Sequence, residues 1–94
     1  MHPLIEKHRT EICALAKRHG IDDLRIFGSM AKGNAGDDSD VDLLVSLPPG
    51  KSGLVLGGLL MDVQELLQRR VEVVTERALH PALRERVLKE AQPL

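Results

Sequence analysis

Two carboxylates two positions apart stand at the start of an apolar run. Asp40 and Asp42 lie within SDVDLLV at residues 39–45. Side chains alternate between the two faces of a strand, so both carboxylates would face the same side if this segment is extended. Neighbouring acidic groups repel one another unless a cation offsets their charge, and hard divalent cations prefer oxygen ligands. The spacing therefore predicts a divalent-metal site.

A third acidic residue interrupts another apolar segment. Glu72 lies in VEVVT at residues 71–75, a run of β-branched residues that predicts a strand. If this strand lies beside 41–47, Glu72 can join Asp40 and Asp42 in a cluster of three carboxylates. Such a cluster suits Mg²⁺ or Mn²⁺. It also suits a two-metal site, in which the metals polarise an attacking oxygen and stabilise the leaving oxygen. The alternative is that the three acids are solvated residues at a sheet edge.

A small-residue turn precedes the acidic pair by about a dozen residues. Gly28 and Ser29 follow the apolar segment 24–27 and precede a short helical segment. Backbone N–H groups at such a turn can bind an anion, and Ser29 and Lys32 could contact phosphate oxygens. By itself the Gly-Ser pair is usually only a turn, and Lys32 could equally be a solvated residue. Together with the acids, the turn predicts a phosphate-binding element beside a metal site.

Other catalytic patterns are not favoured. The GKS at residues 50–52 imitates the end of a phosphate-binding P-loop, but that motif needs a glycine where Val45 stands, and two prolines occupy the supposed cradle. The four histidines show neither zinc-ligand spacing nor paired cysteines. No histidine near Ser29 in the sequence suggests a Ser-His-Asp arrangement.

Composition narrows the class of protein. The chain has 94 residues and a net charge of −1, and Phe27 is its only aromatic residue. Direct nucleic-acid binding is not expected, since it usually needs basic patches or aromatic stacking platforms. The single cysteine, Cys13, is expected to be a buried, reduced thiol. The apolar run 54–61 is too short to cross a membrane and no signal peptide is evident, so the sequence predicts a cytoplasmic protein.

Hydrophobic periodicity predicts alternating helices and strands. Ser29 is expected to cap the short helix, which 33–36 (GNAG) would end, and the final helix is expected to pack through Leu83, Val87, Leu88 and Ala91. This order predicts a two-layer α/β domain covering residues 1–94, with helices packed on a small mixed sheet of about three strands. The predicted helices are 3–18, 30–32, 56–67 and one that follows His80-Pro81; the predicted strands are 24–27, 41–47 and 71–75.

The Gly-Ser turn, the SDVD segment and the later acidic strand resemble the DNA polymerase β-type nucleotidyltransferase superfamily. The size and layout of the chain resemble its minimal nucleotidyltransferases, which implies their fold. The C-terminal segment 83–94 resembles the antitoxin members that are encoded beside HEPN-domain toxins. The resemblance extends over essentially the whole chain.

This resemblance implies a role for each residue of the motif. Three carboxylates would bind the metal and carry catalysis: Asp40, Asp42 and Glu72. Four residues around the turn and the acidic strand would bind the nucleotide: Gly28, Ser29, Lys32 and Ser39. The sequence departs from the family pattern in two places. Glu72 stands where aspartate is common, and Met30 and Lys32 stand where arginine is frequent.

The resemblance also implies an activity. The chain would be a protein adenylyltransferase that uses Mg²⁺, with two ions expected and Mn²⁺ possible, to move AMP from ATP to a tyrosine of a HEPN ribonuclease toxin. Its alternative is an antitoxin that neutralises the toxin by binding alone. A chain this small has little surface left to select an acceptor, so specificity is expected to come from the partner or from a homo- or hetero-oligomer. An aminoglycoside-type enzyme would normally need a second domain.

Overall fold

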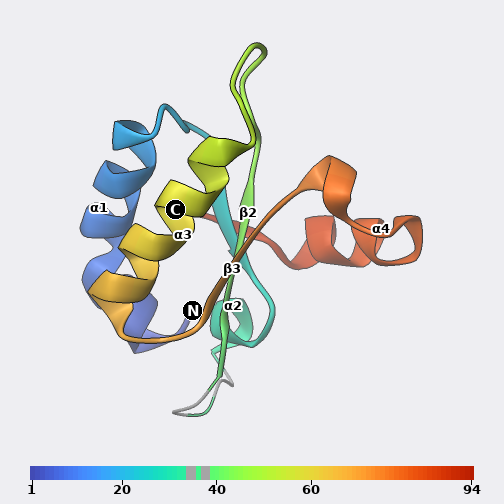
Figure 1. Cartoon of the computed structure of the whole chain (residues 1–94). Coiled ribbons are helices and arrows are strands. Elements are labelled where there is room, and N and C mark those ends of the chain that lie inside the picture. The colour runs from blue at the N-terminus through green and yellow to red at the C-terminus, as the bar shows by residue number, and fades with distance from the viewer. Residues whose placement is uncertain (34–35, 37–38) are drawn as a thin grey trace.

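The computed structural model describes residues 1–33, 36 and 39–94, and its centre is a four-stranded mixed sheet in the order β3–β2–β1–β4 (Figure 1). The strands are β1 (Leu24–Phe27), β2 (Val41–Val45), β3 (Val71–Thr75) and β4 (Gln92–Pro93). β1 is antiparallel to both β2 and β4, whereas β2 and β3 are parallel. The predicted α/β class and the placement of β3 beside β2 are confirmed.

The fourth strand is a correction to the expected sheet of about three strands. β4 has only two residues, one of them proline. A segment this short has no hydrophobic periodicity from which a strand could be predicted. Long-range contacts fix it at the edge beside β1. The Leu94 N–H donates to the Leu24 carbonyl at 3.0 Å, and the Arg9 guanidinium donates to the Pro93 carbonyl at 2.8 Å.

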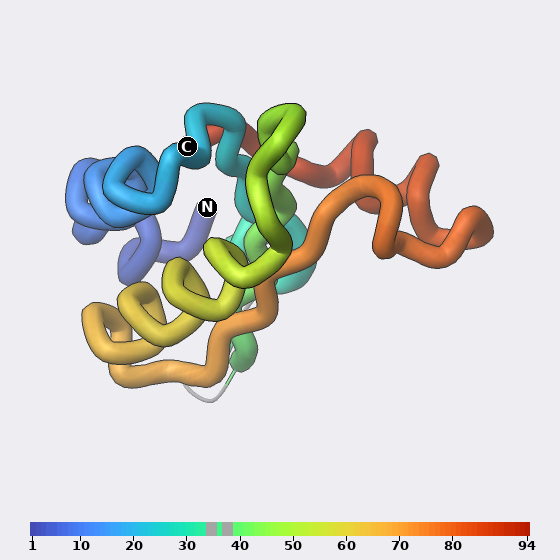
Figure 2. Tube along the Cα trace, turned by 45° about the horizontal axis from the view of Figure 1, so that its top comes forward, coloured from blue at the N-terminus to red at the C-terminus, as the bar shows by residue number. Residues whose placement is uncertain are grey.

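One face of the sheet is covered by α1 (Pro3–Arg18) and α3 (Leu54–Leu67), which lie side by side in both views (Figures 1 and 2). The core between these helices and the sheet is almost entirely aliphatic. Its fully buried side chains include Ile5, Ile12, Ile26, Leu43, Leu59 and Val63. Buried and half-buried residues alternate along β1, whereas four of the five residues of β2 are buried. In the described part of the chain, none of the helices combines the length and apolarity needed to span a bilayer.

The opposite side of the sheet carries α4 (Pro81–Glu90), which follows the short 3₁₀ turn η1 (Glu76–Ala78) (Figure 2). As expected, the His-Pro pair starts α4: Pro81 is its first residue, and the His80 ring nitrogen accepts a hydrogen bond from the Ala82 N–H at 3.1 Å. The predicted inner face is wrong at Leu83, which is 50% exposed. α4 touches the rest of the protein along a narrow edge, so Val87 is its one buried residue.

Three local predictions also need correction. Gly28, not Ser29, is the N-cap of α2 (Ser29–Lys32), and no side chain caps this helix. The strand predicted to reach residue 47 ends at Val45, close to the two prolines that prevent further pairing. Cys13 is half-buried instead of buried, because it lies beside the core-facing stripe of α1. Of the predicted helix end, Gly33 is confirmed as the C-cap, whereas residues 34 and 35 lie outside the described residues.

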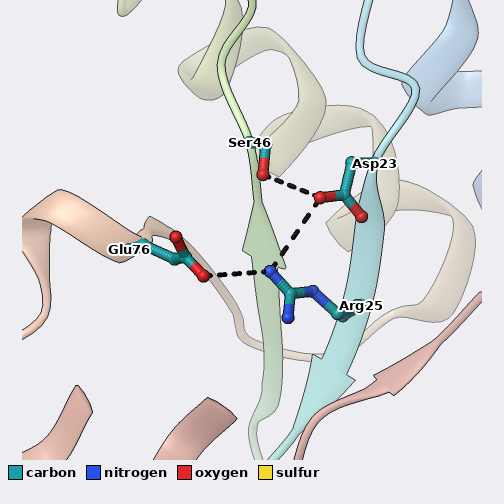
Figure 3. Close-up of polar contacts among 4 residues, drawn as sticks. All are labelled: Asp23, Arg25, Ser46 and Glu76. Atoms are coloured by element: carbon teal, nitrogen blue, oxygen red, sulfur yellow. Dashed lines mark hydrogen bonds and ion pairs between the residues drawn. The ribbon is translucent and has the colours of Figure 1, made fainter. Parts of the chain in front are cut away.

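A polar network ties the strands together at one end of the α4 side of the sheet (Figure 3). The Arg25 guanidinium lies 3.3 Å from a Glu76 carboxylate oxygen and 3.9 Å from one of Asp23. The Ser46 hydroxyl donates to the same Asp23 oxygen at 2.7 Å. Among the described residues, Arg25 Nε is the buried side-chain nitrogen that has no hydrogen-bond partner. The network joins the start of β1 to the ends of β2 and β3.

Candidate active site

Two of the three predicted acidic residues, Asp42 and Glu72, meet on the neighbouring strands β2 and β3. Asp42 of β2 and Glu72 of β3 occupy paired register positions. Asp42 stands between Val41 and Leu43, which point into the core beneath α1 and α3, so its carboxylate projects from the other face. The register therefore brings together two side chains that are separated by α3 in the sequence.

The environment of Asp42 raises the pKa of its carboxyl. Burial, then the hydrogen bond to Glu72, then the negative charges of Glu72 and Asp40 raise the pKa of the Asp42 carboxyl from 3.8 to about 6. Every one of these effects disfavours the charged form. The site is thus an excess of negative charge that a cation would offset.

Asp40 and Ser39 lie just before β2, in the loop that leads into it. The Asp40 side chain is exposed, two residues before Asp42. The Ser39 hydroxyl accepts a hydrogen bond from the Gly36 N–H at 2.9 Å, which gives it a local contact within this loop. Arg69 donates to the Gly36 and Ser39 carbonyls at 3.2 and 3.4 Å. Arg69 therefore helps to hold the approach to Asp40.

Gly28 connects the carboxylates to the turn that was predicted to bind phosphate. A Cβ placed on Gly28 would lie 2.5 Å from Asp42 Oδ2, and Gly28 has φ +74° and ψ −156°. Both the space and the backbone conformation therefore require glycine. Met30, which stands where arginine is frequent in the family, is fully buried and so contributes to the core.

Gly28, Ser29 and Lys32 line one pocket of about 320 Å³, together with residues of α4. The structure thus brings three of the four predicted nucleotide-binding residues together, while Ser39 is not among the residues that line this pocket. On the α4 side the pocket is lined by Leu83, Arg86, Val87 and Glu90. Sequence reasoning missed the contribution of Arg86 and Glu90. Their spacing of four residues indicates a shared helix face, but nothing in the sequence places that face against α2.

The donor set suits a hard divalent cation. All three acidic side chains offer carboxylate oxygens, and burial together with the neighbouring acids raises the pKa of Asp42, so a cation would stabilise its charged form. Among the described residues, no three His, Cys, Asp or Glu side chains are already close enough together to enclose an ion. Mg²⁺ is commonly held by one or two carboxylates together with substrate phosphates, so this open arrangement fits a metal that arrives with a nucleotide.

Together, the fold and the order of turn, acidic strand and later acidic residue define a nucleotidyltransferase domain, and the chain belongs to this family. The family model for the nucleotidyltransferase domain matches residues 5–94. The chain is 37% identical over 87 residues to a Methanocaldococcus jannaschii protein described as a candidate protein adenylyltransferase, covering 93% of this chain and 94% of that protein. It is 33% identical over 87 residues to protein adenylyltransferase MntA of Thermococcus cleftensis, covering 93% of this chain and 85% of MntA.

Solved structures agree on the fold. A structure described as a candidate minimal nucleotidyltransferase is 44% identical, with a TM-score of 0.85 and coverage of 100% of this chain and 97% of that one. A toxin–antitoxin complex with AMP-PNP contains a chain with a TM-score of 0.75 and 20% identity, covering 89% of this chain and 69% of that one. The complex of a tri-AMPylated Shewanella oneidensis HEPN toxin with MNT antitoxin contains a chain with a TM-score of 0.70 and 17% identity. The match covers 94% of this chain and 69% of that one. At such identities the two complexes establish the likeness of fold alone.

Proposed function

We propose that this chain is a Mg²⁺-dependent protein adenylyltransferase that acts as an antitoxin, moving AMP from ATP to a tyrosine of a HEPN ribonuclease toxin. The observation that carries the proposal is the pairing of Asp42 with Glu72 on neighbouring strands, against the Gly28 turn. The names of the relatives from M. jannaschii and T. cleftensis support the same activity.

In this proposal Asp40, Asp42 and Glu72 would hold the metal, with two Mg²⁺ ions expected and Mn²⁺ possible in their place. When bound, the metal supplies positive charge that offsets the carboxylates and the nucleotide phosphates. Gly28, Ser29 and Lys32 bind the triphosphate in the pocket that they line.

The reaction is an in-line displacement at the α-phosphorus of ATP. The tyrosine oxygen forms a new bond to phosphorus while the bond to the bridging oxygen breaks, so pyrophosphate leaves. Glu72, which is exposed at the paired position beside Asp42, accepts the hydroxyl proton and passes it to solvent. The protein contributes mainly by positioning the groups and by stabilising charge.

The proposed partner is a HEPN-domain ribonuclease. The toxin–antitoxin complexes that share this fold support that choice. Asp40 and Glu72 of the candidate site are exposed, so a side chain presented by a second protein can approach them. We therefore expect the partner to complete the acceptor side of this site.

The intact mass of a HEPN-domain protein from the same organism, incubated with this chain, ATP and Mg²⁺, tests the proposal. We expect a gain of one or more AMP units with the wild type and none with Asp40→Asn/Asp42→Asn. Asp22→Asn is the matched control, since Asp22 is an exposed acid outside the cluster. An unchanged mass together with full inhibition of the toxin would reject the transferase and favour the alternative, an antitoxin that acts by binding alone.

A further inference from the structure

The pocket that contains Gly28, Ser29 and Lys32 is completed by α4, a helix that the sequence motif does not include. Arg86 and Glu90 line it from the α4 side, one helical turn apart. This arrangement places the positive charge of Arg86 beside that of Lys32, on the side of the pocket away from the α2 turn. A triphosphate carries more negative charge than one lysine offsets, so Arg86 could bind it together with Lys32.

The two cations share one carboxylate oxygen. Lys32 Nζ lies 3.1 Å from Glu90 Oε1, and Arg86 Nε lies 3.4 Å from the same atom. The hydrogen bond from Lys32 is the largest of the effects that lower the pKa of the Glu90 carboxyl, and Arg86 adds to it. An anionic oxygen held between a lysine and an arginine is the arrangement that a phosphate oxygen would adopt in the same place.

The chain beyond α4 fixes this geometry. The Gln92 side-chain amide donates to the Ala31 carbonyl of α2 at 2.9 Å, immediately after Glu90 and Ala91. β4 then pairs with β1, and Val87 is buried beneath the helix. These contacts hold the C-terminal half of α4 against α2, so the meeting of Lys32, Arg86 and Glu90 is a built feature of the fold.

We propose that Lys32 and Arg86 together bind the triphosphate of the nucleotide, and that Glu90 occupies both cations until the nucleotide displaces it. This inference rests on the proposed function for its ligand and adds a residue of α4 to the site. Glu90 acts as a competing anion, so it weakens nucleotide binding while keeping the two cations together in the free protein.

Calorimetric titration of the full chain with ATP and Mg²⁺ tests this inference, alongside the ATP KM for AMP transfer. We expect Arg86→Gln and Lys32→Gln each to raise the Kd for ATP about tenfold, the usual size of a lost charge-assisted hydrogen bond. Arg86→Lys keeps the charge and should recover much of this loss. Glu90→Gln should lower the Kd about threefold by removing the competing charge.

The matched controls come from the same helix. Glu85 and Lys89 form an ion pair of the same i,i+4 type at 3.5 Å, but neither lines the pocket with Gly28. Glu85→Gln and Lys89→Gln should therefore leave the Kd for ATP unchanged. Circular dichroism of every variant checks that α4 is retained.

The outcomes separate this inference from the proposed function. If the wild type transfers AMP but Arg86→Gln binds ATP with wild-type affinity, the inference fails and the proposed function stands. If ATP binding depends on Arg86 but no AMP is transferred to any HEPN protein, the inference stands and the proposed function fails. Weaker ATP binding by Glu90→Gln would overturn the role of Glu90 as a competing anion, and failure of the wild type to bind ATP would overturn both proposals.

Discussion

The Asp42 carboxylate occupies the space that a side chain on Gly28 would need. Asp42 Oδ2 lies 2.5 Å from the position of a Cβ built on Gly28. The contact joins β2 to the turn before α2, and it brings a candidate metal ligand against the backbone of the proposed phosphate-binding turn. Gly28 is thus required for the shape of the site as well as for its backbone conformation, φ +74°.

Gly28→Ala should abolish AMP transfer and lower the free energy of unfolding by about 3 kcal/mol, since it combines a strained backbone with a steric clash. Gly50→Ala is the matched control: Gly50 has φ +82°, but a Cβ added there would meet nothing within 4 Å. It should cost about 1–2 kcal/mol from the backbone alone and keep the activity. Urea unfolding and transfer rates measure both, and equal losses in the two variants would show that the contact with Asp42 is irrelevant.

Asp42→Asn should stabilise the metal-free protein while abolishing AMP transfer. Burial and the neighbouring Glu72 and Asp40 raise the pKa of Asp42 to about 6, so its ionised form is disfavoured in the folded state. Solvent screening reduces the gain from removing this charge to about 1 kcal/mol at pH 7. Urea unfolding in EDTA measures it, with Asp22→Asn as the control.

The sign of the pH dependence follows from the same shift. Between pH 3.8 and about 6 the folded state binds more protons at Asp42 than the unfolded state does. The contribution of Asp42 to the free energy of unfolding is therefore fully present at low pH and is lost as the pH rises through this window. The stability advantage of Asp42→Asn in EDTA should accordingly grow from pH 4 to pH 7; an advantage that shrinks instead would contradict the repulsion.

Much of the fold could be predicted because its elements carry strong local patterns. The 3.6-residue period of α1, the β-branched run of β3 and the His-Pro start of α4 each indicate an element without help from the rest of the chain. β4 and the exposure of Leu83 could not be predicted in this way. Both depend on how the last helix and the chain end dock against β1 and α2.

In the candidate site, too, some residues could be predicted from local patterns and others depend on tertiary contacts. Asp42 and Glu72 were predictable because acidic residues interrupt apolar strands, and pairing of those strands then brings them together. Arg86 and Glu90 lie on a helix rich in charged residues, where every charge has the same local signal. Only the docking of α4 against α2 distinguishes them from Glu85 and Lys89, and that docking depends on tertiary contacts such as Gln92 to Ala31.

Arg25→Met should cost little stability and leave ATP binding intact. The variant loses the ion pairs to Glu76 and Asp23 but keeps an apolar stem, and both partners remain accessible to water. It also removes the buried Nε that has no partner. We expect a loss of about 0.5–1 kcal/mol that diminishes in high salt. Thermal unfolding at two salt concentrations measures it, with the exposed Arg84→Met as control, and a loss above about 3 kcal/mol would indicate that the network is essential to the fold.

Two neighbouring glycines of α3 should respond in opposite directions to the same substitution. Nothing lies within 4 Å of a Cβ on Gly57, so Gly57→Ala should raise the free energy of unfolding by about 0.5–1 kcal/mol through better helix propensity. A Cβ on Gly58 would lie 2.7 Å from the ring of His19, which is held by a 2.7 Å hydrogen bond to Asp62. Gly58→Ala should therefore cost about 1–3 kcal/mol, because the ring must move and the bond is strained.

A double variant identifies the cause of that loss. If the His19 ring is the obstacle, Gly58→Ala should be much less harmful in a His19→Ala background, where the added methyl group enters the space left by the ring. Urea unfolding of the two single variants and the double variant gives the coupling free energy, expected to be about 1 kcal/mol or more. Strict additivity would show that the close approach of Gly58 to His19 does not limit the packing of α1 against α3.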